Sequence, residues 1–228
     1  MKYKINGTTM QALDVELDSG EAVFTETGGM SWMSENIEMD TNMKGGVLSG
    51  LKRKLAGESL FMTTYKAKGP SKITFTGEFV GKIIDMNLGA GQQVICQKDA
   101  FMCAQDSVSL AIHFQKKLGA GLFGGEGFVL EKVTGPGTVF LEISGEVVER
   151  ELAAGEKLKV NPGYVAAFEP TVTYDIERVK GVTNMLFGGE GMFLVSLKGP
   201  GKVWLQTMPL QTVASALVQY LPIPKSTR

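Results

Sequence analysis

The segment with the clearest chemical spacing is the glycine-rich stretch Gly119 to Gly124, which reads Gly-Ala-Gly-Leu-Phe-Gly. This spacing holds a dinucleotide phosphate when a strand precedes it and a helix follows. Here an alternating, strand-like run follows, Phe128 to Val133, and the corresponding residues 184–189 lack the three-glycine spacing. We therefore interpret these glycines as loop geometry and expect no dinucleotide site.

His113 is the only histidine of the chain. A metal site inside a β-barrel usually combines two or more imidazoles with a carboxylate. One histidine cannot build such a site, and it supports a histidine-based triad only if a neighbouring subunit supplies a residue. We expect a histidine on a strand or at the surface, with no metal and no cofactor.

Cys96 and Cys103 are the two cysteines, and they do not form a CxxC pair. Cys96 ends a strand-like run, and Cys103 follows it closely. We interpret both as small buried apolar residues in a reducing compartment. A disulfide or a redox role is the alternative.

Three glutamates recur in the same glycine-containing turn. Because one turn is repeated three times, we interpret these glutamates as structural, accepting backbone N–H groups, rather than as a catalytic pair of carboxyls with different pKa values. A Gly-Pro turn follows each copy, with proline setting φ. The turn residues are Gly57, Glu58, Gly125, Glu126, Gly189 and Glu190, and the prolines are Pro70, Pro136 and Pro200.

Basic residues precede these turns in each copy. If the copies are equivalent in space, the cations form one rim that can contact phosphate or anionic lipid. The alternative is a solvated charge cluster beside a buried loop. The candidate rim consists of Lys52, Arg53, Lys54, Lys116, Lys117 and Lys180.

The repetition itself predicts the fold class. Copies of a turn, an alternating strand, a Gly-Pro turn and a second strand start 68 and then 64 residues apart. Short alternating strands between tight turns are typical of all-β sandwiches and barrels. The exceptions are a helix-like segment at Leu210 to Tyr220, ended by Pro222, and a weaker one at Val47 to Leu55. We predict an all-β fold of three tandem, circularly permuted β-sandwich units with a short C-terminal helix.

The copies start in mid-unit, which leads to a specific expectation about the termini. We place the repeats at residues 44–110 and 111–176, with the third made of residues 177–228 and 1–43. The third repeat then requires the N-terminal segment to pair with the C-terminal segment, so that the chain closes on itself.

Composition limits the classes of partner. The chain has 228 residues and a net charge of −1, so no bulk field attracts nucleic acid. Trp32 and Trp204 are the only tryptophans, fewer than stacking along a single strand requires, and both read as core or interface residues. We see no signal sequence and no run long enough to span a membrane, and we expect a cytoplasmic location.

Three motifs of the sequence together resemble those of one protein family. They are the turn of residues 186–191, the hairpin of Thr134 to Ser144, and the closing Val203 to Pro209. The chain resembles the bacterial and archaeal group related to the yeast protein "altered inheritance of mitochondria, number twenty-four", from about Met10 to about Leu221. The resemblance implies a fold similar to the tryptophan RNA-binding attenuation protein, with trimers forming rings of nine units. It supplies no catalytic residues, and the family is linked to mitochondrial biogenesis.

Our favoured hypothesis is a non-enzymatic homo-oligomeric scaffold or adaptor, a ring-like homotrimer whose partners are proteins or a membrane surface. The alternative is a ring that binds RNA or a small ligand, by analogy with the attenuation protein. Net charge and the few aromatic residues weigh against nucleic acid. An enzyme is the third hypothesis, and no constellation of side chains supports it.

Overall fold

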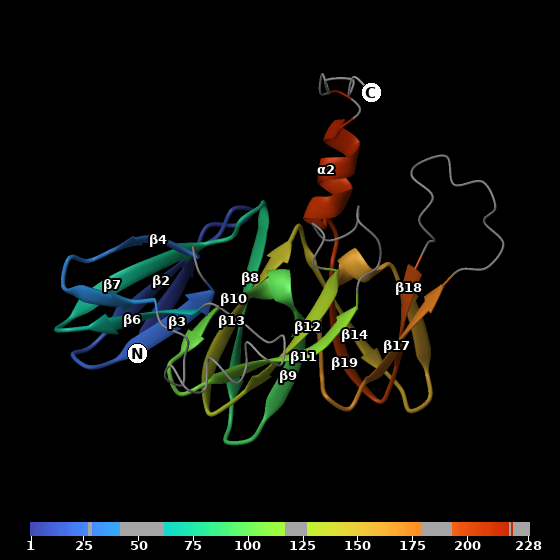
Figure 1. Ribbon diagram of the computed structural model, residues 1–228, viewed down its shortest axis with the longest axis horizontal. Helices are drawn as coiled ribbons and strands as arrows, with labels where there is room; N and C mark the ends of the chain where they lie inside the picture. Colours follow the sequence, from blue (N-terminus) through green and yellow to red (C-terminus); the bar gives the residue numbers. More distant parts are fainter. Residues whose placement is uncertain (27–28, 42–61, 117–126, 179–192, 219, 221–228) are drawn as a thin grey trace, which may run out of the picture.

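In the computed structural model, the chain forms three similar sets of β-strands, which lie side by side along the longest axis of the molecule (Figure 1). The structure describes residues 1–26, 29–41, 62–116, 127–178, 193–218 and 220. We call the three sets the first, second and third units. The first contains β1 (Lys2–Asn6), β2 (Ala12–Leu17), β3 (Ala22–Glu26), β4 (Met30–Met33), β5 (Ile37–Asp40), β6 (Met62–Ala67) and β7 (Ser71–Thr76). The second contains β8 (Gly81–Leu88), β9 (Gln93–Gln97), β10 (Phe101–Gln105), β11 (Ser109–Lys116), β12 (Phe128–Thr134) and β13 (Gly137–Ser144). The third contains β14 (Val147–Leu152), β15 (Lys157–Val160), β16 (Val165–Phe168), β17 (Thr173–Arg178), β18 (Phe193–Lys198) and β19 (Gly201–Gln206).

The alternating sequence explains why these segments are strands. In β2, Leu13, Val15 and Leu17 are buried, and the residues between them are more exposed. Successive side chains of a strand point to opposite faces, so this pattern buries one face against a second sheet. The prediction of an all-β fold is confirmed.

The units are joined because their sheets are continuous. The four sheets have the strand orders β1-β2-β7-β4, β5-β6-β3-β10-β13-β8, β11-β12-β9-β16-β19-β14 and β15-β18-β17. The two six-stranded sheets each combine three strands of one unit with three of the next. The boundaries between units are therefore antiparallel strand pairs, β3 with β10 and β9 with β16.

The three units are equivalent residue by residue at one irregularity. In each unit the register shifts after the first residue of a strand, at Met30 in β4, Phe101 in β10 and Val165 in β16. The residues paired after this β-bulge are Trp32 with Thr74, Cys103 with Phe140, and Ala167 with Trp204. A bulge bends the strand and re-aims its side chains. Its recurrence fixes which residues of the units correspond.

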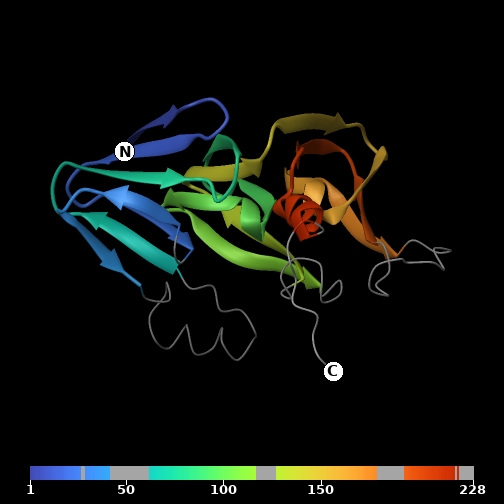
Figure 2. The same ribbon diagram turned by 90° about the horizontal axis from the view of Figure 1, so that it is seen from above.

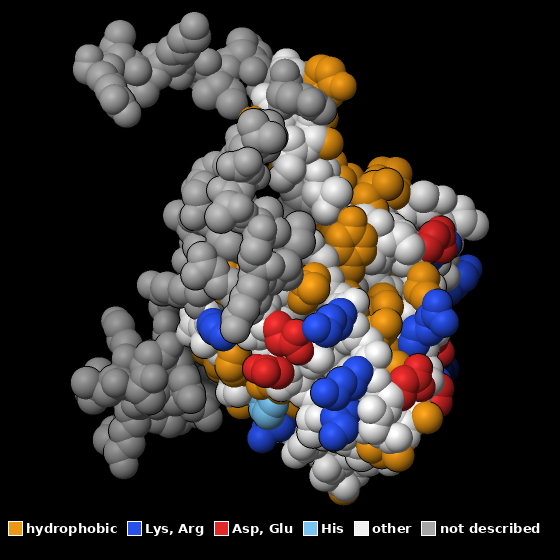
Figure 3. All heavy atoms as spheres, turned by 90° about the vertical axis from the view of Figure 1, so that its right-hand side faces the viewer, with side chains coloured by type: hydrophobic (Ala, Val, Ile, Leu, Met, Phe, Trp, Pro, Cys, Tyr) orange, Lys and Arg blue, Asp and Glu red, His pale blue; other side chains and the backbone are white. Residues whose placement is uncertain are grey.

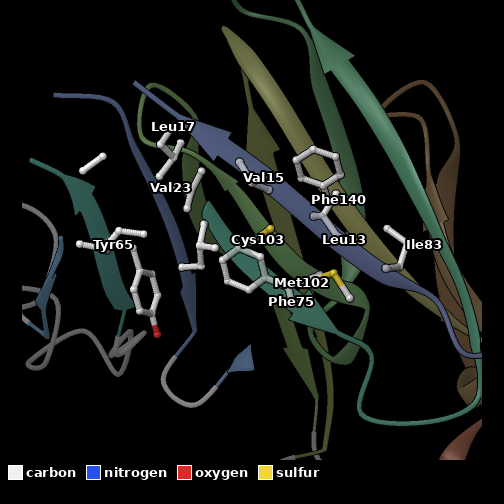
Figure 4. Close-up of a cluster of buried hydrophobic side chains, with 13 residues drawn as sticks. Leu13, Val15, Leu17, Val23, Tyr65, Phe75, Ile83, Met102, Cys103 and Phe140 are labelled. Atoms are coloured by element: carbon white, nitrogen blue, oxygen red, sulfur yellow. The ribbon is translucent and has the colours of Figure 1, made fainter. Parts of the chain in front are cut away.

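The hydrophobic core runs across the boundaries between units. One cluster combines Leu13, Val15 and Phe75 of the first unit with Cys103 and Phe140 of the second, as Figure 4 shows. The next cluster combines residues of the second unit with Ala167 and the half-buried Trp204 of the third. The equivalent residues of each following unit thus complete the core of the unit before it.

Among the described strands, the N-terminal segment does not pair with the C-terminal segment, which differs from the expectation. β2 and β4 both pair with β7, and β18 pairs with β15 and β17. The strand pairs therefore group residues 1–76, 81–144 and 147–206, instead of residues 44–110, 111–176 and 177–228 with 1–43. The repeated motif begins at the second half of each unit, and a repeat of this kind does not reveal where the unit starts. That residues 1–228 form a single unit built of three pseudo-repeats with the bounds given above stays a prediction.

The C-terminal helix is confirmed. α2 (Leu210–Val218) stands beyond the sheets in Figure 1, and none of its residues is buried. The second helix-like segment, residues 47–55, lies outside the described residues.

Candidate functional site

Most of the candidate basic rim and of the repeated turns lies outside the described residues. This holds for Lys52, Arg53, Lys54, Lys117 and Lys180, and for Gly57, Glu58, Gly125, Glu126, Gly189 and Glu190. It holds for residues 119–124 as well. The described member of the rim is Lys116, exposed at the end of β11. The three segments connect equivalent strands, β5 to β6, β11 to β12 and β17 to β18.

The Gly-Pro turns are described, and two of them share one geometry. The peptide bonds Gly135-Pro136 and Gly199-Pro200 are cis. A Cβ at Gly135 would lie 2.5 Å from the carbonyl oxygen of Gly89, and one at Gly199 would lie 2.5 Å from that of Ala153. This close backbone approach requires glycine. Pro70 lies in the corresponding turn of the first unit, between β6 and β7.

The two joints between units have the same register. At the first joint Ala104 pairs with Phe24, and at the second Phe168 pairs with Ile95. By the shared bulge, Ala104 corresponds to Phe168. The strands β3 and β9 also correspond, because β3 pairs with β6 as β9 pairs with β12. One mode of strand association is therefore used twice within the chain.

A matched pair of side chains lies beside each joint, in the strand pairs β10–β13 and β16–β19. Cys103 and Phe140 are both fully buried at the first joint. At the second, Ala167 is fully buried and its partner Trp204 is half-buried, with its indole Nε1 3.2 Å from Glu149 Oε1. In both pairs one residue is small and the other aromatic.

The third pair of this kind, Trp32 with Thr74, lies in the first unit. Trp32 is 57% exposed, whereas the equivalent Cys103 and Ala167 are 0% exposed. Among the described strands, β4 has one neighbour, β7, and β15 has one neighbour, β18. β4 and β15 are thus the open counterparts of the strands joined inside the chain. Figure 3 looks onto the end formed by the third unit, where hydrophobic side chains lie between clusters of charged ones.

A buried carboxyl group lies close to the first joint. Glu131 is 0% exposed, and no N–H or hydroxyl group donates to either of its oxygens. Burial and the charge of Glu26 raise the pKa of Glu131 into the alkaline range. At neutral pH Glu131 is therefore protonated and can donate its O–H to the Glu26 carboxylate, which lies at the end of β3.

A second glutamate near this joint is less perturbed. Burial raises the pKa of Glu142 to about 7, although its carboxylate accepts a hydrogen bond of 2.8 Å from the backbone N–H of Glu78. Glu142 lines a cavity of about 370 Å³ together with Glu26, Lys98 and Asp99. Across the described residues, no group of three or more His, Cys, Asp or Glu side chains is placed to hold a metal ion.

The two cysteines and the histidine all lie on β-strands. Cys96 and Cys103 are free and fully buried, as predicted, and burial raises the pKa of both thiols. His113 lies on β11, as expected for a strand histidine, with its ring centroid 5.9 Å from that of Tyr174. Partial burial lowers its pKa.

Sequence reasoning missed two features of this region. Glu131 shares a strand face with Val129 and Val133, and a carboxyl between two valines on an alternating strand is a readable signal of burial. The exposure of Trp32 had no such signal, because it depends on which strand ends a sheet.

The described part of the chain contains no helix with the length and apolar character needed to cross a lipid bilayer.

Comparison with known proteins places the chain among uncharacterized relatives. The model of the family described as "Mitochondrial biogenesis AIM24" matches residues 3–208. An uncharacterized protein of Streptococcus pyogenes serotype M6 is 27% identical over 231 residues, covering 97% of this chain and 92% of that protein. A crystal structure of a Streptococcus pyogenes protein matches with a TM-score of 0.79 at 24% identity, covering 96% of this chain and 99% of that one. The latter likeness shows a shared fold.

Proposed function

The chain belongs to the AIM24 family, and from this premise we propose that it is a non-enzymatic, homo-oligomeric scaffold or adaptor. The assembly we propose is a ring-like trimer. Its partners are proteins or a membrane surface, contacted by the basic segments of the three equivalent loops. We also propose that its units have a fold similar to that of the tryptophan RNA-binding attenuation protein.

One observation supports self-assembly. The joint between units is formed twice inside the chain, and the strands at the two ends keep the edges that this joint uses. Exposed strand edges invite pairing with another chain, and proteins usually cover or close them. Repeating one asymmetric contact between copies produces a closed ring when the rotation per copy divides a full turn.

A scaffold role is also consistent with the placement of the candidate loops. They occur once per unit at equivalent strand ends, so a ring of copies displays them at regular intervals. Repeated display increases avidity for a partner or a surface without requiring a catalytic centre.

Light scattering on a sizing column tests the proposal. We expect a mass of three times the 24.5 kDa chain, independent of loading concentration over a tenfold range. A mass of one chain at every concentration would contradict self-assembly and remove the basis of the scaffold proposal.

A further inference from the structure

We propose that β4 of one copy pairs with β15 of a second copy, in the antiparallel register that already joins the units within the chain. This inference rests on the proposed self-assembly and specifies its contact. The occupant of each open edge is therefore a second copy of this chain.

The strands correspond by position in each unit. β10 and β16 are the strands that pair with the preceding unit, through β3 and β9. β4 is their counterpart in the first unit, because it carries the same β-bulge and pairs with β7 as they pair with β13 and β19. β15 is the counterpart of β3 and β9, because it pairs with β18 as they pair with β6 and β12.

The internal joints predict the register between copies. The pair Ala104 with Phe24, and its equivalent Phe168 with Ile95, correspond to Met33 with Lys159. The pair Ala167 with Cys96 corresponds to Trp32 with Val160.

Charge and bonding at the end of this register agree with the pairing. Two positions beyond Met33, Glu35 faces Lys157 of the second copy, which places opposite charges across the joint. At the first internal joint the equivalent backbone N–H, that of Asp106, donates to Ala22 O at 3.1 Å.

The side chains at the open edge have the composition that a joint requires. Next to each joint inside the chain, the strand pair β10–β13 or β16–β19 places a small residue opposite an aromatic one, Cys103 with Phe140 and Ala167 with Trp204. At the open end the corresponding pair is Trp32 with Thr74. There the aromatic residue lies on the bulged strand and the small residue on its partner.

The core of the third unit lacks the contribution that the other two cores receive. The first core includes Phe140 of the following unit, and the second includes Ala167. Among the described residues, the third cluster draws on the second and third units alone, and Leu158 of β15 packs at its border. Trp32 of a second copy occupies this place in the proposed contact, which explains why so large an apolar side chain is exposed in the isolated chain.

The contact is directional. β4 and β15 are different surfaces, so the copies associate head to tail, and a dimer in which two β4 strands or two β15 strands meet is excluded. Paired cysteines test this directly. We choose Glu35→Cys and Lys157→Cys, because both residues are exposed and face each other in the proposed register. Facing residues of antiparallel strands have Cα separations near those of disulfides. The native Cys96 and Cys103 are buried and do not interfere.

The two single variants are mixed under mild oxidation and the covalent dimer is followed on a denaturing gel. We expect the mixture to cross-link at least tenfold faster than either variant alone. The matched control mixes Lys157→Cys with Glu38→Cys, an exposed acidic position on β5, which belongs to a different sheet from β4, and we expect it to react no faster than single variants. The double variant Glu35→Cys with Lys157→Cys should give a ladder of covalent oligomers that ends at the ring size.

The outcomes separate this inference from the proposed function. If light scattering shows an oligomer while the Glu35 and Lys157 mixture reacts no faster than the control, the β4–β15 register is wrong and self-assembly stands. If Glu35→Cys alone gives the fastest cross-link, two β4 strands meet and the head-to-tail arrangement is overturned. A monomeric mass in light scattering would contradict both the β4–β15 contact and the proposed self-assembly.

Discussion

Trp32 and Ala167 follow the same β-bulge at equivalent positions of the first and third units, yet Trp32 is 57% exposed and Ala167 is 0% exposed. The difference arises from their neighbours. Ala167 pairs with Cys96 of the preceding unit, whereas β4 has β7 as its single neighbour among the described strands. The exposed tryptophan thus lies where the repeat pattern stops, and it provides the first test of self-association.

Replacing this side chain should weaken self-association. Buried tryptophans at interfaces are frequent hot spots, and their truncation typically costs about 2 kcal/mol or more, roughly a thirtyfold loss of affinity. We expect Trp32→Ala to dissociate at higher concentrations than the native protein in sedimentation velocity. The control is Tyr220→Ala, which removes a more exposed aromatic residue distant from β4. Equal dissociation of native protein and Trp32→Ala would remove Trp32 from the contact.

The buried Glu131 predicts a pH dependence of stability. Its pKa is raised in the folded state, so between the ordinary glutamate pKa and the raised one the folded protein binds one more proton than the unfolded chain. Stability therefore falls as pH rises, by at most about 1.4 kcal/mol per pH unit from this group. Glu131→Gln keeps a donor for Glu26 and has no proton to lose. We expect its free energy of unfolding in urea to exceed that of the native protein by an amount that grows from pH 5 to pH 8.

The control for this pH series is Glu177→Gln. Glu177 is partly exposed and forms an ion pair with Lys159 at 2.7 Å, which lowers its pKa. Its replacement should give a difference from the native protein that stays constant between pH 6 and pH 8. A similarly constant difference for Glu131→Gln would show that Glu131 does not titrate in this way.

The two thiols should be unreactive in the folded protein. Cys96 and Cys103 are fully buried and their pKa values are raised, so little thiolate is available for attack. We expect no rapid reaction with a colorimetric disulfide reagent in native buffer and reaction of both thiols in denaturant. Tyr220→Cys supplies an exposed thiol as positive control, which should react at once. Rapid labelling of a native thiol would show that the joint region opens.

The first internal joint should contribute strongly to stability. Phe140 is fully buried between the cores of two units, with the ring of Tyr3 4.8 Å away. Phe140→Ala should lower the free energy of unfolding by about 3–5 kcal/mol, as is typical for large cavities. Leu217→Ala on the exposed helix α2 should change it by less than about 0.5 kcal/mol. Urea unfolding of both variants at one protein concentration makes the comparison, and similar losses would contradict a core role for Phe140.

The basic rim can be tested without disturbing the core. Replacing Lys52, Arg53, Lys54, Lys116 and Lys117 with alanine should leave the urea midpoint unchanged and reduce binding to vesicles containing anionic lipid. The physical reason is the loss of about 1 kcal/mol for each cation near such a surface. The control replaces the same number of exposed lysines on the strands: Lys2, Lys4, Lys66, Lys72 and Lys198. Undiminished binding by the rim variant would exclude the rim from the contact.

Much of the fold could be read from the residues themselves. The alternating pattern of β2 and β13, the Gly-Pro turns and the three copies of one motif predicted an all-β chain of repeated units with a C-terminal helix. These features are local, because side-chain alternation and turn geometry depend on neighbours along the chain. The burial of Cys96 and Cys103 followed from the same pattern.

The order of pairing could not be read in this way. The sequence repeat was equally compatible with units that begin at residue 1 or at residue 44, and the expected pairing of the two termini is not found among the described strands. Which strands pair is decided by the packing of whole sheets, here by a core in which Phe140 completes the first unit and Ala167 the second. The sequence alone thus determined the strands, turns and repetition, whereas only the tertiary structure decided which edges are joined and gave β4 and β15 one neighbour each among the described strands. The physical reason is that a strand edge is defined by contacts between residues far apart in the chain.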